Sequence, residues 1–170
     1  MVSETLERLV KPVFDEADLS YHIHNNGQAI TIMMNSPRSS YRFVINYQEK
    51  AELLIVACWN ITRFDLKDMA TAIQLANSLN RIRPGKFTID EEGALDFIYE
   101  ISVTERTTPD DFADVFDRAV NIVDGSFETI MKTRWTPKPR NGGSKRKHQD
   151  PSKHDKGIAQ LIEEALNQDD

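Results

Sequence analysis

Strict alternation of apolar and polar side chains marks the stretch that decides the fold, Tyr41-Arg42-Phe43-Val44-Ile45-Asn46-Tyr47-Gln48. A period of two predicts a β-strand with one apolar face. The next run, residues 53–59, is apolar at every position. Such a run predicts a strand that is covered on both sides or that lies at a contact with another chain. Residues 21–34 supply β-rich runs around the turn Asn26-Gly27, so we expect a meander of three or four strands.

Helical spacing of apolar residues marks the segments on either side of this meander. Intervals of three and four predict helices over residues 4–16, 66–79 and 109–131. Pro12 lies inside the first helix and is expected to kink or shorten it. A β-hairpin over residues 87–103 separates the other two helices. The order α, strands, α, β-hairpin, α predicts an α+β domain, an antiparallel sheet with helices packed on one face.

Charge divides the 170 residues into three parts, although the length fits about one domain. Residues 1–131 hold 12 basic and 21 acidic residues, a net charge of −9. Residues 132–156 hold nine basic and two acidic residues, a net of +7, and residues 157–170 hold four acidic residues and no basic one. We expect an α+β domain over 1–131, a basic flexible linker over 132–156 and a short amphipathic acidic helix over 157–170.

Several protein classes are disfavoured by composition. No apolar run approaches the roughly 20 residues that cross a bilayer, and the first residues lack the pattern of a signal peptide. A single cysteine, Cys58, excludes an internal disulfide framework and fits a reducing compartment. The sequence therefore predicts a cytoplasmic protein without a membrane segment.

Three short motifs follow the second predicted helix, namely Ala76-Asn77-Ser78-Leu79-Asn80, Gly85-Lys86-Phe87-Thr88-Ile89-Asp90 and Gly93-Ala94-Leu95-Asp96-Phe97. With these motifs the chain resembles, over residues 2–131, the YbjN family of bacterial sensory transduction regulators, whose fold is like that of type III secretion chaperones. The resemblance implies a cytoplasmic bacterial protein without a known catalytic centre, whose structural relatives dimerise and hold other proteins. It supplies no catalytic residue. The motif residues also have a structural interpretation, because Asn80 can satisfy backbone groups at a helix end and Gly85 and Gly93 serve turns.

The side chains that could bind a metal or act as a nucleophile do not combine into a recognisable site. His22 and His24 share one side of a predicted strand and would form half of a metal site, but the sequence offers no third ligand at a telling spacing. Cys58 lies in the apolar run and is expected to be a buried, inert thiol. No phosphate-binding loop or nucleophile elbow occurs. We therefore predict no catalytic residue, no metal, no cofactor and no enzymatic activity.

A partner surface is expected on the sheet face that does not build the core. If Tyr41, Phe43 and Ile45 face the core, the opposite face is expected to carry an apolar set: Val44, Leu54, Val56, Cys58 and Ile98. Exposed, such a patch marks a dimer contact or a groove for a client protein. Burial under a loop or under the N-terminal helix is the alternative.

The tail after residue 131 offers two further candidates. The first is an amphipathic stripe at helical spacing: Ile158, Leu161, Ile162, Ala165 and Leu166. A segment this short is marginal alone in water, so either it frays or it orders on docking to this domain, a second subunit or another protein. The second is the basic run Lys145-Arg146-Lys147, which would bind nucleic acid, solubilise the linker or lie on the acidic body.

These features predict a non-enzymatic, cytoplasmic, chaperone-like regulator of the YbjN type. It would bury a partner's apolar segment against its own apolar surface, as a homodimer, with its acidic body favouring basic partners. The alternative is a dimeric regulator whose basic tail contacts nucleic acid.

Overall fold

The computed structural model describes residues 2–24, 27–81 and 84–135 of the chain. All of them belong to one compact unit, Met1–Thr136. The elements follow in the order α1 (Glu4–Leu9), α2 (Lys11–Glu16), β1 (Tyr21–His24), β2 (Ala29–Asn35), β3 (Ser40–Gln48), η2 (Glu49–Ala51), β4 (Leu53–Arg63), η3 (Leu66–Asp68), α3 (Met69–Leu79), β5 (Lys86–Ile89), β6 (Ala94–Ser102) and α4 (Pro109–Trp135). The predicted α+β class and element order are confirmed.

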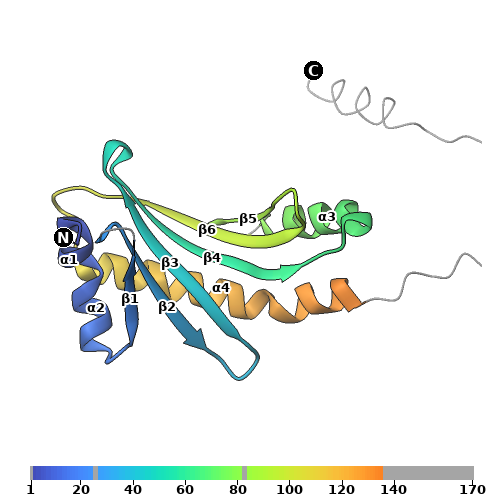
Figure 1. The fold of residues 1–170 in the computed structure, drawn as a ribbon, viewed down its shortest axis with the longest axis horizontal. Helices are drawn as coiled ribbons and strands as arrows, with labels where there is room; N and C mark the ends of the chain where they lie inside the picture. The colour runs from blue at the N-terminus through green and yellow to red at the C-terminus, as the bar shows by residue number, and fades with distance from the viewer. Residues whose placement is uncertain (1, 25–26, 82–83, 136–170) are drawn as a thin grey trace, which may run out of the picture. The chain divides into compact units, whose positions relative to one another are not determined.

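The strands form one antiparallel sheet, in the order β1-β2-β3-β4-β6-β5 within the described residues. Neighbours from β1 to β4 are joined by short turns, whereas α3 connects β4 to the edge strand β5. Figure 1 shows α4 running along this sheet, with α1 and α2 toward one end of α4 and α3 toward the other. None of the described helices is long and apolar enough to cross a membrane.

Strand register assigns every side chain to one of two faces, because directly paired residues point to the same side of a sheet. One row of partners crosses all six strands and faces the core: Tyr21, Ile32, Phe43, Cys58, Phe97 and Phe87. The parallel row through Ile45 and Val56 does the same. Large aromatic side chains therefore line the face on which the helices pack.

Aromatic rings join the helices to that face. The Phe116 ring of α4 lies 5.6 Å from the Phe43 ring of β3 and 5.1 Å from the Phe14 ring of α2, both edge-on. Edge-to-face pairs at such distances add about 0.5–1.5 kcal/mol beyond the burial of their area. At the far end of α4, Arg134 Nη1 donates a 2.8 Å hydrogen bond to Thr62 Oγ1 of β4. Helix α4 is thus fixed to the sheet along its length.

Helix boundaries follow the local sequence signals. The predicted helix over residues 4–16 is interrupted at Val10, and Pro12 lies in the first turn of α2, where its missing N–H donor is tolerated and its ring crowds the preceding turn. Thr108 and Asp111 form a reciprocal cap at the start of α4, with Thr108 N–H donating to Asp111 Oδ2 at 2.8 Å and Asp111 N–H donating to Thr108 Oγ1 at 3.2 Å. Helix α4 passes through Gly125 and extends four residues beyond the expected boundary at residue 131.

Candidate functional site

The second face of the sheet carries no covering helix among the described residues, and we call it the open face. It is defined by side chains whose register or alternation opposes the core row: Thr31, Met33, Arg42, Val44, Ile55, Ala57, Trp59, Lys86, Ile98 and Glu100. One row, Thr31–Val44–Ala57–Ile98, crosses the four central strands. Apolar side chains on three neighbouring strands, Val44, Ala57 and Ile98, therefore lie side by side on the face opposite the core.

Two of the large side chains on the open face are conspicuously exposed. Met33 is 51% exposed and Trp59 is 39% exposed, and both line a shallow hollow of about 310 Å³ with Arg42. Val44, Ile55 and Ile98 are half-buried by their own neighbours. The small Ala57 between them is buried.

The expected composition of this face is correct for two residues and wrong for three. Val44 and Ile98 lie on the open face, as predicted, but Leu54, Val56 and Cys58 lie in the core at 1%, 0% and 1% exposure. Their register partners Tyr47, Ile45 and Phe43 share the core face with them. The apolar run in β4 gives no periodicity, so only the length of the β3–β4 turn decides which residues face outward. The open-face members from β4 are instead Ile55, Ala57 and Trp59.

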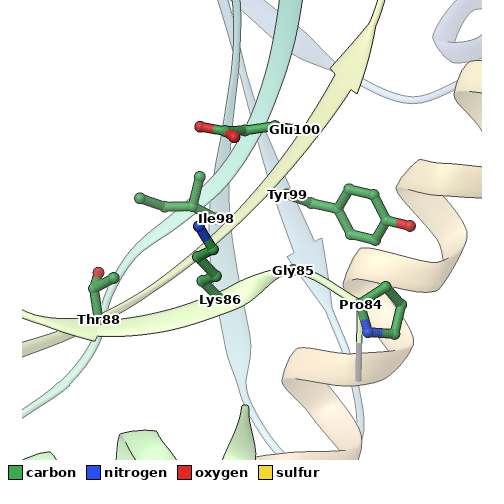
Figure 2. Close-up of a pocket in the computed structure, with 7 residues that line it drawn as sticks. All are labelled: Pro84, Gly85, Lys86, Thr88, Ile98, Tyr99 and Glu100. Atoms are coloured by element: carbon green, nitrogen blue, oxygen red, sulfur yellow. The ribbon is translucent and has the colours of Figure 1, made fainter. Parts of the chain in front are cut away.

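A pocket of about 250 Å³ extends the open face to the β5 edge. Figure 2 shows Ile98 and Glu100 on one side of β6, with Tyr99 turned to the other side. The lining combines one cation, one anion and an apolar floor: Pro84, Gly85, Lys86, Thr88, Ile98, Tyr99 and Glu100. Such a shallow, mixed surface suits a side chain of a bound peptide better than a small reactive substrate.

The side chain of Asn80 forms hydrogen bonds with the outward-facing backbone groups of the edge strand β5. Its side-chain amide donates to the Phe87 carbonyl oxygen at 2.9 Å and accepts from the Phe87 N–H at 2.7 Å. These are the two groups that a further strand would pair with. The structural interpretation of Asn80 is therefore correct, and this edge is protected at its centre.

Asp90 also has a structural role, at the β5–β6 turn. Its Oδ1 accepts the N–H groups of Glu92 at 2.9 Å and Ala94 at 2.8 Å. The acidic turn is thus stabilised by hydrogen bonds from its own backbone N–H groups to the Asp90 side chain. Lys86, from the same sequence motif, is exposed beside the pocket.

The histidine pair lies on the exposed edge strand β1. The rings of His22 and His24 are 4.3 Å apart, edge to face, on the open-face side. Within the described ranges, no group of three or more metal-binding side chains occurs. Two imidazoles alone leave a tetrahedral metal half coordinated.

Burial suppresses the ionisation of Cys58 and Asp96. Burial raises the pKa of the Cys58 thiol to about 12, so the reactive thiolate is scarce at neutral pH. Burial also raises the pKa of the Asp96 carboxyl, while the Asn60 N–H, which donates to it at 2.6 Å, acts against that rise. Asn60 has a positive φ of 56° in the irregular part of β4, and Asp96 holds that backbone in place.

The candidates in the tail lie outside the described residues. This applies to the apolar stripe of Ile158, Leu161, Ile162 and Leu166 and to the basic run Lys145, Arg146 and Lys147. They remain predictions from the sequence.

No protein-family model matches the chain, and no curated protein matches it. Solved structures are similar to it. A chain of the HopA1–SchA chaperone–effector complex has a TM-score of 0.51 at 11% identity, covering 71% of this chain and 91% of that one. YbjN from E. coli has a TM-score of 0.49 at 12% identity, covering 72% and 89%. A chain of the ExoU–SpcU complex from the type III secretion system of Pseudomonas aeruginosa has a TM-score of 0.47 at 11% identity, covering 76% and 100%.

The first of these similarities bears on the fold. At this low identity it shows a shared architecture, and it confirms the expected type III secretion chaperone-like fold.

Proposed function

We propose that this chain is a non-enzymatic, chaperone-like protein that binds an apolar segment of another protein on the open face. The observation that carries the proposal is the apolar set Val44, Ala57 and Ile98 on neighbouring strands, together with exposed Met33 and Trp59 on the same face. A sheet face that is polar in most two-layer domains is here apolar at its centre. Exposed apolar patches of this kind mark protein interaction sites.

The free energy available on this face is sufficient for recognition. A tryptophan side chain buries up to about 250 Å², so 39% of Trp59 amounts to roughly 100 Å². At about 25 cal/mol per Å², covering this side chain alone contributes roughly 2.5 kcal/mol. Aromatic residues in well-packed, desolvated pockets dominate the energetics of many interfaces. Trp59 is therefore the expected anchor of the site.

Charge around the site favours a partner with basic groups beside its apolar segment. Residues 1–131 carry a net charge of −9, and complementary charge accelerates association. The similarity to a chain of a chaperone–effector complex supports a protein as partner. A reducing, cytoplasmic location fits the buried thiol of Cys58.

We further propose a homodimer that leaves the open face free. On η3 and α3, Leu66 is 68% exposed and Ile73 is 47% exposed, seven residues apart and thus on one side of the helical path. A symmetric contact would place this stripe against its own copy. Light scattering of the full chain should give a dimer mass, and Leu66→Lys with Ile73→Lys should give a monomer mass with unchanged circular dichroism.

Affinity capture from the source cell tests the partner site. The full chain and a Val44→Asp/Ile98→Asp variant are compared with Gln28→Asp/Asn121→Asp, which adds the same charge at exposed polar positions outside the face. We expect a reproducible partner that the full chain and the control retain and the face variant loses. The proposal would be contradicted if the full chain and the face variant captured the same proteins, or if no specific partner were captured.

A further inference from the structure

The two edges of the sheet differ in how their outer backbone groups are satisfied. On the β5 edge, the Asn80 side chain occupies the N–H and carbonyl groups of Phe87. On the opposite edge, no described strand pairs with the outer side of β1, and apart from β2 no described residue forms a hydrogen bond with the β1 backbone. Strand β1 also lacks the lysine, proline or bulge that commonly protects an exposed edge. The β1 edge is therefore open to pairing with another strand.

The side chains of β1 have a symmetric pattern about Ile23. The strand contains His22-Ile23-His24, with both histidines on the open-face side and Ile23 on the core side of the sheet. All three side chains are exposed. Ile23 is 36% exposed, whereas its row partners Ile30 and Ile45 on the inner strands are fully buried. An apolar side chain at the margin of the core thus remains available to a further strand.

A second copy of the chain matches this pattern. When two identical strands pair antiparallel about a twofold axis at Ile23, His22 of one copy lies opposite His24 of the other. Directly opposed residues point to the same side of the sheet, with Cβ atoms about 4.5–5.5 Å apart. The contact therefore gathers four imidazoles on the open-face side and brings the two Ile23 side chains together on the other side.

The histidine pair of one copy already has the arrangement of half a metal site. The two rings are 4.3 Å apart, and their register partners on β2 are the small, uncharged residues Thr31 and Ala29. Zinc is commonly held by four protein ligands in a tetrahedron, with Zn–N distances of about 2.0–2.1 Å. One chain supplies two imidazole ligands at this edge. The second copy supplies the two that are missing.

We propose that two copies of the chain pair through β1 and share one divalent transition-metal ion of the zinc class, bound by His22 and His24 of each copy. Imidazole is a suitable ligand for such ions. The ion is required, because two domains that each carry a net charge of −9 repel each other and a pairing of four residues per strand is short. A divalent cation at the junction reduces that repulsion and joins the strands.

The β1 contact is separate from the homodimer contact proposed above on η3 and α3. Helix α3 packs beside β5, whereas β1 is the other edge of the sheet. A chain that uses both contacts should form assemblies larger than a dimer in the presence of zinc. The test is therefore made with Leu66→Lys/Ile73→Lys in the full chain, which restricts association to β1. The β1 contact does not rest on the proposed partner site.

A Zn²⁺ titration followed by light scattering and calorimetry tests the proposal. We expect the mass to at least double at one zinc per two chains. It should return to the metal-free value in large excess of zinc, because each histidine pair then holds its own ion. His22→Gln/His24→Gln should keep the metal-free mass throughout. The matched control His148→Gln/His154→Gln removes the other two histidines of the chain and should behave as its parent.

Ile23→Lys separates strand pairing from metal binding. It sets two like charges opposite each other at the twofold axis and keeps both histidines, so the variant should bind zinc without a change in mass. Circular dichroism checks that each variant is folded.

Four results would overturn the proposal. These are one zinc bound per chain without a change in mass, association that persists in His22→Gln/His24→Gln, association that is lost in His148→Gln/His154→Gln, and unchanged association of Ile23→Lys. Absence of zinc binding by the parent chain would overturn it as well. Capture of a partner through Val44 and Ile98 succeeds or fails independently of all these results.

Discussion

Replacement of Asn80 by alanine tests the closure of the β5 edge. The substitution removes the donor to the Phe87 carbonyl oxygen and the acceptor of the Phe87 N–H, at 2.9 and 2.7 Å. Both backbone groups lose the partners that stand in for a seventh strand. We expect lower stability and an edge that pairs with other chains.

The magnitude follows from the number of hydrogen bonds and their burial. A hydrogen bond contributes about 0.5–1.5 kcal/mol net, and a buried polar group left without a partner costs about 1–3 kcal/mol. The site is part-buried, so water recovers some of the loss. We expect about 2 kcal/mol less free energy of unfolding, which lowers Tm by roughly 6–8 °C in a domain of this size.

Urea denaturation and concentration-dependent size-exclusion chromatography measure the two effects. Asn77→Ala is the matched control, because Asn77 is exposed on the same helix, α3. Asn80→Asp keeps the acceptor for the Phe87 N–H and loses the donor, so its stability should lie between those of the native chain and Asn80→Ala. Equal midpoints for Asn77→Ala and Asn80→Ala would refute the assignment of Asn80 as an edge closure.

Three further substitutions or conditions have defined outcomes. Gly125→Ala should raise the free energy of unfolding by about 1 kcal/mol in urea denaturation, because a Cβ at this helical position meets no atom within 4 Å. Gly93→Ala should lower it by more than about 2 kcal/mol, because φ is +84° and the added Cβ collides with the Phe64 carbonyl oxygen. Burial raises the pKa of the Cys58 thiol to about 12, so native Cys58 should react with a disulfide reagent at pH 8 far more slowly than the urea-unfolded chain. Because the folded pKa exceeds the unfolded value, this contribution to stability is complete below pH 8 and is lost as the pH rises from about 9 toward 12.

Local signals in the sequence predicted most of the architecture. Alternation in residues 41–48 predicted β3 with its correct core face, and the spacing of apolar residues predicted the start of α4 at residue 109. These features depend on neighbours within four residues, which is the range over which sequence patterns act. The division of residues 4–16 at Val10, just before Pro12, has the same local origin.

Features that depend on pairing between segments were not predictable in the same way. The outward direction of Trp59 depends on the register between β3 and β4, and a shift of one residue would exchange the two faces of β4. Exposure of Met33 likewise depends on its pairing with Arg42. One signal was available: a tryptophan at the end of a run that is apolar at every position indicates more apolar surface than one core can bury.

The separation of core and open face makes stability and binding independent of each other. Phe43 and Val56 are buried, and truncation of such side chains costs about 2–5 kcal/mol in any protein. Val44 is half-buried and Trp59 is 39% exposed, so their replacement by polar residues removes less from folding than truncation of a core side chain does. Exposed positions away from special contacts change stability by only about 0.5 kcal/mol. Under the proposed function, alternate residues of β4 divide folding and binding within one strand, with Val56 in the core and Trp59 on the open face.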